Sequence, residues 1–238
     1  ILIPELMREV SFGGFFNEIA CFIKLVMQLR ALKKLYPDII SHTHSTKAGL
    51  MGRWAAYCAC IRYRVHTIHG YGFHDHQRCV VRFLTYVLEL ITSCITSHFV
   101  CVSSQDAKRG IKIFPAFAKK HSIIRAAIDW DVFAHKNSRR EPLVGPNVFV
   151  IGTSGCFRIG KNHLELFKAF EIVHSRHPNA RLELLGDGIL RPLYETWIKE
   201  HDLQDVVILR GWQHDVAPIM RTWNAFAFTS LWEGMPCS

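Results

Sequence analysis

The sequence lacks several signatures that would identify a protein class. Its eight cysteines contain no Cys-x-x-Cys pair and stand mostly in apolar segments, which argues for buried thiols in a reducing compartment, not for a disulfide framework or a zinc site. The fourteen histidines are scattered and include no H-E-x-x-H motif. His42, His44, His66 and His69 converge at predicted strand ends, but the interpretation we favour has no metal there.

Long uncharged apolar runs are also missing, so the sequence predicts no transmembrane helix, which would need about 18 such residues. The most apolar window, residues 83–102, contains Glu89 and His98 and is typical of a helix followed by a strand. The first residue is Ile1 and not Met, with no signal peptide before it, and we expect a fragment.

Charge is distributed unevenly along the chain. Residues 1–145 hold 20 Lys and Arg against 10 Asp and Glu, a net charge of +10, whereas residues 146–238 hold 9 against 10, a net charge of −1. The basic half indicates an anionic partner. Because no helix-turn-helix, zinc-finger or RNA-binding signature is visible, we predict an anionic membrane surface and not nucleic acid.

Both halves of the 238-residue chain alternate helices with strands. In the first half we predict helices over residues 15–36, 48–60 and 78–92 and one capped by Ser104, with strands over 39–43, 64–68, 99–102 and 122–125. In the second half we predict strands over 148–152, 181–185, 206–209 and 225–229, and helices over 161–176, 189–201 and 215–222. The apolar residues expected to share one face of the first helix are Ile19, Phe22, Ile23, Val26, Leu29, Leu32 and Leu35.

The segment between the halves has the composition of a linker. Residues 134–146 combine Asn, Ser, Pro and Gly with charged residues. We therefore predict an α/β protein with two Rossmann-like domains, residues 1–133 and 147–238, whose parallel sheets face a cleft and are both incomplete. Ligands of such sheets lie at the carboxyl ends of the strands.

A glycine-rich turn follows the first strand of the second half. The run Val148-Phe149-Val150-Ile151 leads into Gly152-Thr153-Ser154-Gly155, and Lys161 stands where the next helix begins. Such a turn alone is equally typical of a tight βα connection. Backbone N–H groups and the helix dipole nevertheless favour an anion there, and glycine lets a phosphate approach closely. Together with Gly186-Asp187-Gly188 and Glu233 after later strands, the layout predicts a site for a nucleotide-linked sugar.

These motifs resemble a known family. Lys161, Gly186-Asp187-Gly188 and Glu233-Gly234-Met235-Pro236 are similar to the donor-binding domain of the retaining GT-B glycosyltransferases known as family 4. The first half, with His42-Thr43-His44-Ser45, Lys47-Ala48-Gly49 and His66-Thr67-Ile68-His69-Gly70, is similar to members that extend bacterial surface polysaccharides and glycolipids. The resemblance covers residues 4–236. Relative to the family, strands before Ile1 and a second glutamate after Ser238 are missing, so we do not expect the fragment to be active by itself.

The resemblance implies a role for each matching residue. Family 4 enzymes transfer a sugar from a nucleotide diphosphate with retention and without a bound metal, so we expect no cofactor, and Lys161 with N–H donors would neutralise the diphosphate. The predicted catalytic residues are Glu233, which matches the carboxylate that binds donor-sugar hydroxyls, and His69, which matches the acceptor-side histidine. The predicted donor site further contains Gly155, Arg158, Gly186, Asp187, Gly188, Gly234, Met235 and Pro236, and the acceptor-side candidates are His44 and Lys47. Cys156 departs from the family, where an arginine is usual, and Arg158 is its candidate substitute.

The sequence thus predicts a hexosyltransferase that uses a nucleotide-diphosphate sugar and a lipid-linked or glycan acceptor in surface polysaccharide or glycolipid synthesis. We expect it in the cytoplasm, peripheral at the inner face of the cell membrane. Two alternatives stay open. One is a nucleotide-sugar 2-epimerase, which shares the two-domain architecture, and the other is a non-catalytic membrane-associated scaffold of the same fold, which Cys156 favours.

Overall fold

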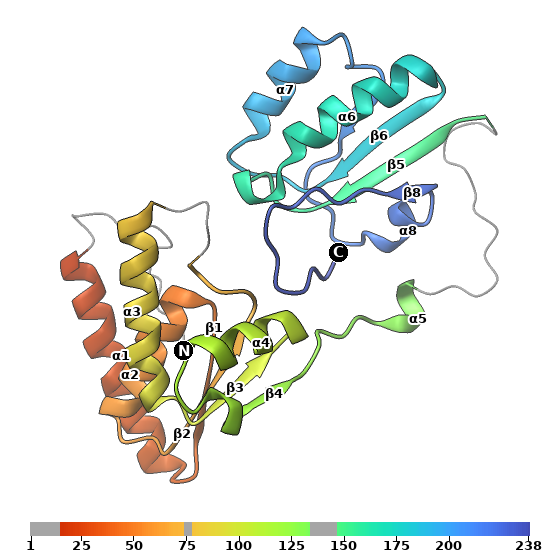
Figure 1. Ribbon diagram of the computed structural model, residues 1–238. Helices are drawn as coiled ribbons and strands as arrows, with labels where there is room; N and C mark the ends of the chain where they lie inside the picture. The colour runs from red at the N-terminus through yellow and green to blue at the C-terminus, as the bar shows by residue number, and fades with distance from the viewer. Residues whose placement is uncertain (1–14, 74–77, 134–146) are drawn as a thin grey trace. The chain divides into compact units, whose positions relative to one another are not determined.

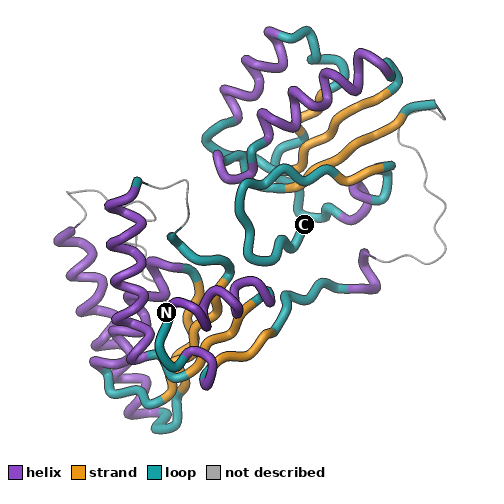
Figure 2. The backbone as a smooth tube through the Cα atoms, in the orientation of Figure 1, coloured by secondary structure: helices purple, strands orange, loops and turns teal. Residues whose placement is uncertain are grey.

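The structure is a computed structural model that describes residues 15–73, 78–133 and 147–238. The chain divides into two compact units, residues 1–126 and 127–238. Each unit contains one sheet of four parallel strands with helices packed against it (Figures 1 and 2). The predicted α/β class with two parallel sheets is therefore confirmed. The predicted linker, residues 134–146, lies outside the described residues, and the domain boundaries that depend on it stay predictions.

The first unit runs from helix α1 to strand β4, with its strands in the order β1-β2-β3-β4. Every neighbouring pair is parallel, so the helix between successive strands returns the chain to the same end of the sheet. The bounds are α1 Phe15–Leu35, β1 Ile40–His44, α2 Thr46–Cys58, β2 Tyr63–Ile68, α3 Cys79–Ile95, β3 His98–Cys101, α4 Ser104–Ile113, a 3₁₀ turn Phe117–Lys119 and β4 His121–Ile123.

Two local predictions in this unit were wrong. Phe22, Val26 and Leu29 of α1 pack against α2 as expected, but three other residues of the predicted face, Ile19, Ile23 and Leu35, are 42%, 53% and 71% exposed. The inward stripe of α1 runs instead through Cys21 and Leu25, which keep the spacing of three to four residues. Helix α4 is capped by Ser103 and not by Ser104, because the Ser103 hydroxyl accepts the Asp106 backbone N–H at 3.1 Å.

The second unit has its strands in the order β7-β6-β5-β8, again all parallel. Strand β8 is shorter than the predicted 225–229, and α8 is shorter than the predicted 215–222. The bounds are α5 Trp130–Phe133, β5 Phe149–Ser154, a 3₁₀ turn Ile159–Lys161, α6 His163–Arg176, β6 Ala180–Leu185, α7 Arg191–Glu200, β7 Val207–Leu209, α8 Ala217–Met220 and β8 Ala225–Phe226.

Alternation along β6 supplies both faces of this sheet. Leu182 and Leu184 enter the main core with residues of α6 and α7, whereas Leu185 packs with Trp223 on the opposite face. Trp223 lies directly on Gly152, where an added Cβ would stand 1.8 Å from its ring. Among the helices that the structure describes, none is long and apolar enough to cross a membrane.

Candidate functional site

The two glycine turns of the second unit lie against each other at the carboxyl ends of β5 and β6. The Gly155 N–H donates to the Leu185 carbonyl oxygen at 2.9 Å. Gly186 has φ of +131°, and an added Cβ would stand 2.1 Å from the Gly155 carbonyl oxygen, so only glycine fits there. The turn predicted from sequence is therefore held by a second glycine turn 31 residues later in the chain.

Asp187 forms its hydrogen bonds and its ion pair within and next to its own turn. Its Oδ1 accepts the Gly188 N–H at 2.7 Å, and its Oδ2 lies 3.2 Å from Nη1 of Arg191. The Asp187 carbonyl oxygen also accepts the Phe157 N–H at 2.9 Å. The carboxylate thus shapes the loop.

Lys161 and Glu233, two of the predicted site residues, form an ion pair. Lys161 closes the 3₁₀ turn just before α6, and its Nζ lies 2.6 Å from Oε1 of Glu233 and 5.4 Å from the ring centroid of Phe228. Gly155 leaves room for this side chain, because a Cβ there would stand 3.2 Å from Cε of Lys161. The cation that sits at a helix start is therefore partnered by a carboxylate of the same unit.

Backbone contacts bring the Glu233 segment to Lys161. The Thr229 hydroxyl donates to the carbonyl oxygens of Lys161 and Asn162 at 3.1 and 3.2 Å, and the Leu231 N–H donates to the Gly160 carbonyl oxygen at 2.9 Å. Sequence reasoning missed Thr229, whose only signal was a polar residue at the end of the predicted strand 225–229.

His163, the first residue of α6, was also missed. Its ring is buried edge-on against Phe157 and Tyr194, and its Nδ1 has no hydrogen-bond partner among the described residues. Burial, with a smaller contribution from the charge of Lys161, lowers the pKa of His163 to about 4. A neutral imidazole therefore supports the glycine loop without adding a second cation beside Lys161.

The remaining predicted donor residues lie at the surface around this ion pair. Gly234 and Met235 are half-buried in the loop after β8, and within the described chain neither N–H donates to a protein acceptor. Pro236 is exposed, as is Arg158 at the start of the 3₁₀ turn, whereas Cys156 is half-buried. The chain thus presents free N–H donors and one exposed cation near Lys161.

In the first unit, the structure brings His44 and His69 together at the carboxyl ends of β1 and β2. His44 Nδ1 lies 3.0 Å from His69 Nε2, so one ring donates and the other accepts. Burial, with a smaller contribution from the charge of His44, lowers the pKa of His69 below its ordinary value. His69 is therefore neutral near pH 7 and suited to hydrogen bonding. Lys47, the other acceptor-side candidate, forms an ion pair of 2.5 Å with Glu18 of α1.

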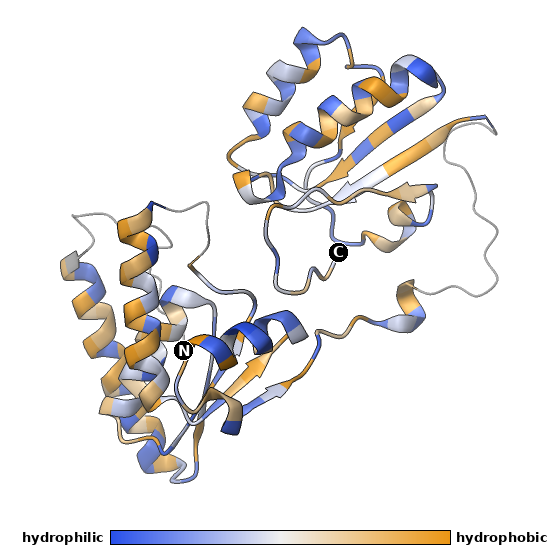
Figure 3. Ribbon diagram, in the orientation of Figure 1, coloured by the Kyte–Doolittle hydropathy of each residue, from blue (hydrophilic) through white to orange (hydrophobic). Residues whose placement is uncertain are grey.

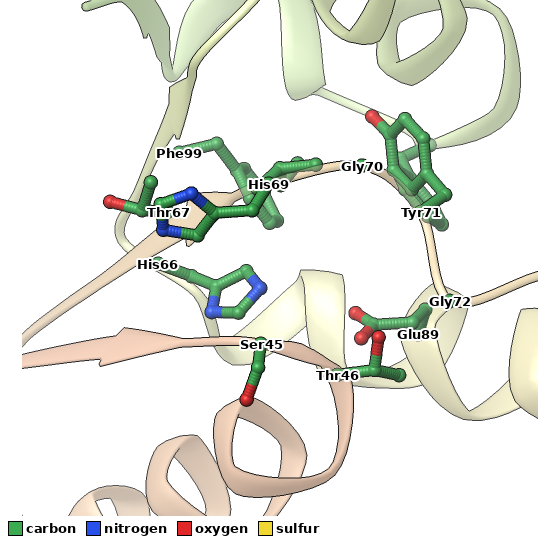
Figure 4. A pocket seen from close by; sticks show the side chains of 12 residues that line it. Ser45, Thr46, His66, Thr67, His69, Gly70, Tyr71, Gly72, Glu89 and Phe99 are labelled. Atoms are coloured by element: carbon green, nitrogen blue, oxygen red, sulfur yellow. The ribbon is translucent and has the colours of Figure 1, made fainter. Parts of the chain in front are cut away.

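A pocket opens beside His69 (Figure 4). His66 and His69 line one part of it, and Thr46 and Glu89 lie at the other end. Burial, with a smaller contribution from the charge of Arg53, lowers the pKa of His66 to about 3. This ring is therefore neutral as well. The pocket combines neutral imidazoles with one buried carboxylate, a set that suits hydroxyl groups.

Two predictions about the site stay predictions. No group of three or more His, Cys, Asp or Glu side chains in the described part of the chain is arranged to hold a metal ion, and the expected absence of a cofactor is not tested. Glu233 and His69 belong to different units, so their predicted approach across one cleft is not tested either.

Comparisons with known proteins point to one class. The family model described as "Glycosyl transferases group 1" matches residues 135–238. The UDP-Gal:alpha-D-GlcNAc-diphosphoundecaprenol alpha-1,3-galactosyltransferase of Escherichia coli is 30% identical over 242 residues, which is 98% of this chain and 61% of the relative. The N-acetylgalactosamine-N,N'-diacetylbacillosaminyl-diphospho-undecaprenol 4-alpha-N-acetylgalactosaminyltransferase of Campylobacter jejuni is 29% identical over 130 residues, 55% of this chain and 33% of the relative.

Solved structures share the fold. Anabaena Alr3699/HepE in complex with UDP and glucose has a TM-score of 0.68 at 16% identity and covers 89% of this chain, which covers 56% of that protein. Sucrose-phosphate synthase from Thermosynechococcus elongatus has a TM-score of 0.72 at 16% identity, with 96% and 59% covered. The chain therefore spans less than two thirds of the length of these relatives. The matches support the predicted GT-B glycosyltransferase, whereas membership of family 4 and retention stay predictions.

Proposed function

We propose that this chain is part of a family 4 glycosyltransferase that moves a hexose from a nucleotide-diphosphate sugar to a lipid-linked glycan acceptor with retention. The observation that carries the proposal is the Lys161–Glu233 pair of 2.6 Å beside the glycine turn at the start of α6. The group 1 glycosyltransferase model matches the same segment of the chain.

The donor would lie over this turn. Its diphosphate meets Lys161 and the start of α6, where a cation and unpaired N–H groups stabilise the charge that develops on the leaving group. Arg158 is exposed nearby and supplies a second cation in place of the arginine that Cys156 replaces. Glu233 then exchanges its contact with Lys161 for the hydroxyls of the sugar, and the N–H groups of Gly234 and Met235 hold the sugar from below.

The acceptor would meet the donor from the first unit. His69, a neutral imidazole that contacts His44, would hydrogen-bond the donor sugar, and His44 and Lys47 would contact the acceptor. The relatives from Escherichia coli and Campylobacter jejuni are named for diphospho-undecaprenol acceptors, which supports a lipid-linked one here. We place the reaction in the cytoplasm at the inner face of the membrane, in surface polysaccharide or glycolipid synthesis, with no metal.

The epimerase alternative is not favoured, because the relatives are named as transferases. The scaffold alternative keeps one observation in its favour, the cysteine at position 156. Titration calorimetry of the full-length protein with UDP and GDP separates it from an enzyme, because a scaffold need bind neither nucleotide.

Three variants of the full-length protein test the proposed roles. Lys161→Ala should weaken nucleotide-diphosphate binding by about 1.5–3 kcal/mol, the range for hydrogen bonds to charged groups. Glu233→Gln and His69→Ala should lower turnover in a donor-panel transfer assay while nucleotide affinity changes little, because sugar positioning matters most in the transition state. Lys168→Ala is the matched control, since this exposed lysine of α6 pairs with Glu165 at the surface. Unchanged affinity in Lys161→Ala, or normal transfer by Glu233→Gln, contradicts the assignment.

A further inference from the structure

Helix α3 packs its polar residues inward. Its buried residues are Glu89, Thr92 and Ser93. Glu89 accepts from Nη2 of the buried Arg53 at 2.8 Å, and Thr92 accepts from Nε1 of Trp54 at 2.9 Å. The interface between α2 and α3 is therefore held by hydrogen bonds and one buried ion pair, where apolar packing is the usual arrangement.

The exposed residues of the same helix are largely apolar, and α3 is mostly orange in Figure 3. Leu84, Leu88 and Ile91 lie within one stripe at the spacing of three to four residues and are 54%, 51% and 50% exposed. The other exposed apolar residues of α3 are Val80, Val81 and Phe83. A patch of this extent on one helix marks an interaction surface and not scattered exposure.

The unit that carries this face is strongly basic. The described residues of the first unit, 15–73 and 78–126, hold 16 Lys and Arg against 4 Asp and Glu, a net charge of +12. Arg78 and Arg82 are exposed at the start of α3. An apolar helix face with cations beside it is complementary to a bilayer that carries anionic headgroups, and much less so to an average protein surface.

We propose that the outward face of α3 docks in the interfacial region of an anionic lipid bilayer, with Leu84, Leu88 and Ile91 in the acyl boundary and Arg78 and Arg82 at the headgroups. This inference rests on the proposed function for its partner, because a lipid-linked acceptor is presented at such a surface. Since the polar side of α3 is already satisfied by Arg53 and Trp54, the helix lies along the bilayer and does not cross it.

Vesicle binding by the full-length protein tests the proposal. We expect the wild type to float with vesicles of phosphatidylcholine and phosphatidylglycerol, more weakly with phosphatidylcholine alone, and less as salt rises. The triple variant Leu84→Gln, Leu88→Gln, Ile91→Gln should partition at least about tenfold more weakly. The matched control replaces three exposed apolar residues of the second unit, Ile172, Ile189 and Leu193, by glutamine and should bind as the wild type does.

A second measurement does not depend on weakened binding. Leu88→Trp should gain fluorescence that brominated phosphatidylcholine quenches, whereas Ile172→Trp should not. Absence of flotation by the wild type, equal flotation by the triple variant, or no quenching in Leu88→Trp overturns the proposal. Self-association of the wild type that the triple variant loses, without vesicle binding, assigns the face to an interface between copies and also overturns it.

Transfer assays separate this inference from the proposed function. The triple variant should keep transfer to an acceptor analogue with a short, water-soluble tail and lose transfer to an acceptor embedded in vesicles. A wild type that transfers to neither acceptor contradicts the proposed function, while the flotation and quenching results still decide the docking surface.

Discussion

Helices α3 and α6 each follow a strand of a parallel sheet, yet they turn opposite faces to the protein. Helix α6 buries Leu166, Phe167 and Phe170 and leaves charged residues outside. Helix α3 buries Glu89, Thr92 and Ser93, with Leu90 half-buried against the core, and leaves Leu84, Leu88 and Ile91 outside. The difference shows that hydrophobic periodicity identifies an amphipathic helix but does not say which face meets the protein. That choice depends on the partners, which for α3 are the guanidinium of Arg53 and the indole of Trp54.

The largest expected effect concerns the buried ion pair beneath α3. Arg53→Leu leaves the Glu89 carboxylate buried without its partner and should lower the free energy of unfolding by about 3–5 kcal/mol. Urea denaturation of the full-length protein, followed by circular dichroism, measures the loss. The double variant Arg53→Leu, Glu89→Leu should recover most of it, because two apolar side chains can replace a buried pair. A double variant no more stable than Arg53→Leu contradicts a polar interface held by this pair.

The corresponding test in α6 removes apolar packing. Leu166→Ala, in the main core of the second unit, should cost about 2–5 kcal/mol in the same assay, because the cavity cannot fully collapse. Ile172→Ala on the exposed side of α6 is the matched control and should stay within about 0.5 kcal/mol of the wild type. Equal losses in the two variants mean that α6 does not have the orientation described.

Much of the fold was predictable because β3, β5, β6 and β7 contain short apolar runs that end in polar loops. The structure has β2, β5, β6 and β7 within two residues of the predicted bounds. The length of strand β8 was overestimated. Ala227 and Phe228 continue the apolar run, but the pairing of β8 with β5 ends at Phe226, opposite Gly152. The face of α1 was partly mispredicted because it carries apolar residues on more than one side, and a count of spacings cannot separate the side that packs on α2.

At the candidate site, sequence predicted individual residues better than their contacts. Lys161 and Glu233 were each singled out by a local motif, but their ion pair depends on contacts between segments about 70 residues apart. Thr229 and His163 have no motif, and their roles follow only from the folded positions of the Lys161 carbonyl and the Phe157 ring. The approach of His69 to Glu233 stays a prediction.

We expect acid to have an intermediate effect on the free energy of unfolding. One buried histidine from each unit contributes to it. The folded pKa values are about 3 for His66 and about 4 for His163, both below the ordinary 6.5. Below pH 6.5 the unfolded chain takes up protons that these folded sites refuse, so the free energy of unfolding falls as pH falls, by up to about 1.4 kcal/mol per pH unit and histidine. The fall in the free energy of unfolding that His163 causes ends near pH 4, and the fall that His66 causes ends near pH 3.

Urea denaturation between about pH 7 and pH 5 measures this slope. His66→Asn and His163→Asn should each show a shallower fall than the wild type, because asparagine takes up no proton. Parallel curves for the wild type and both buried-site variants contradict neutral buried imidazoles.

The smallest expected effect completes the comparison of the two helices. Leu84→Gln and Leu88→Gln each replace an exposed apolar side chain of α3 by a polar one of similar length, so each should change the free energy of unfolding by no more than about 0.5 kcal/mol. The same exchange at Leu166 of α6 buries an amide without partners and should cost several-fold more. If Leu88→Gln destabilises the protein as Leu166→Gln does, the apolar face of α3 is buried in the native protein, and a membrane-docking role for it fails. If Leu88→Gln is neutral for stability and yet weakens vesicle binding, the face serves association and not folding.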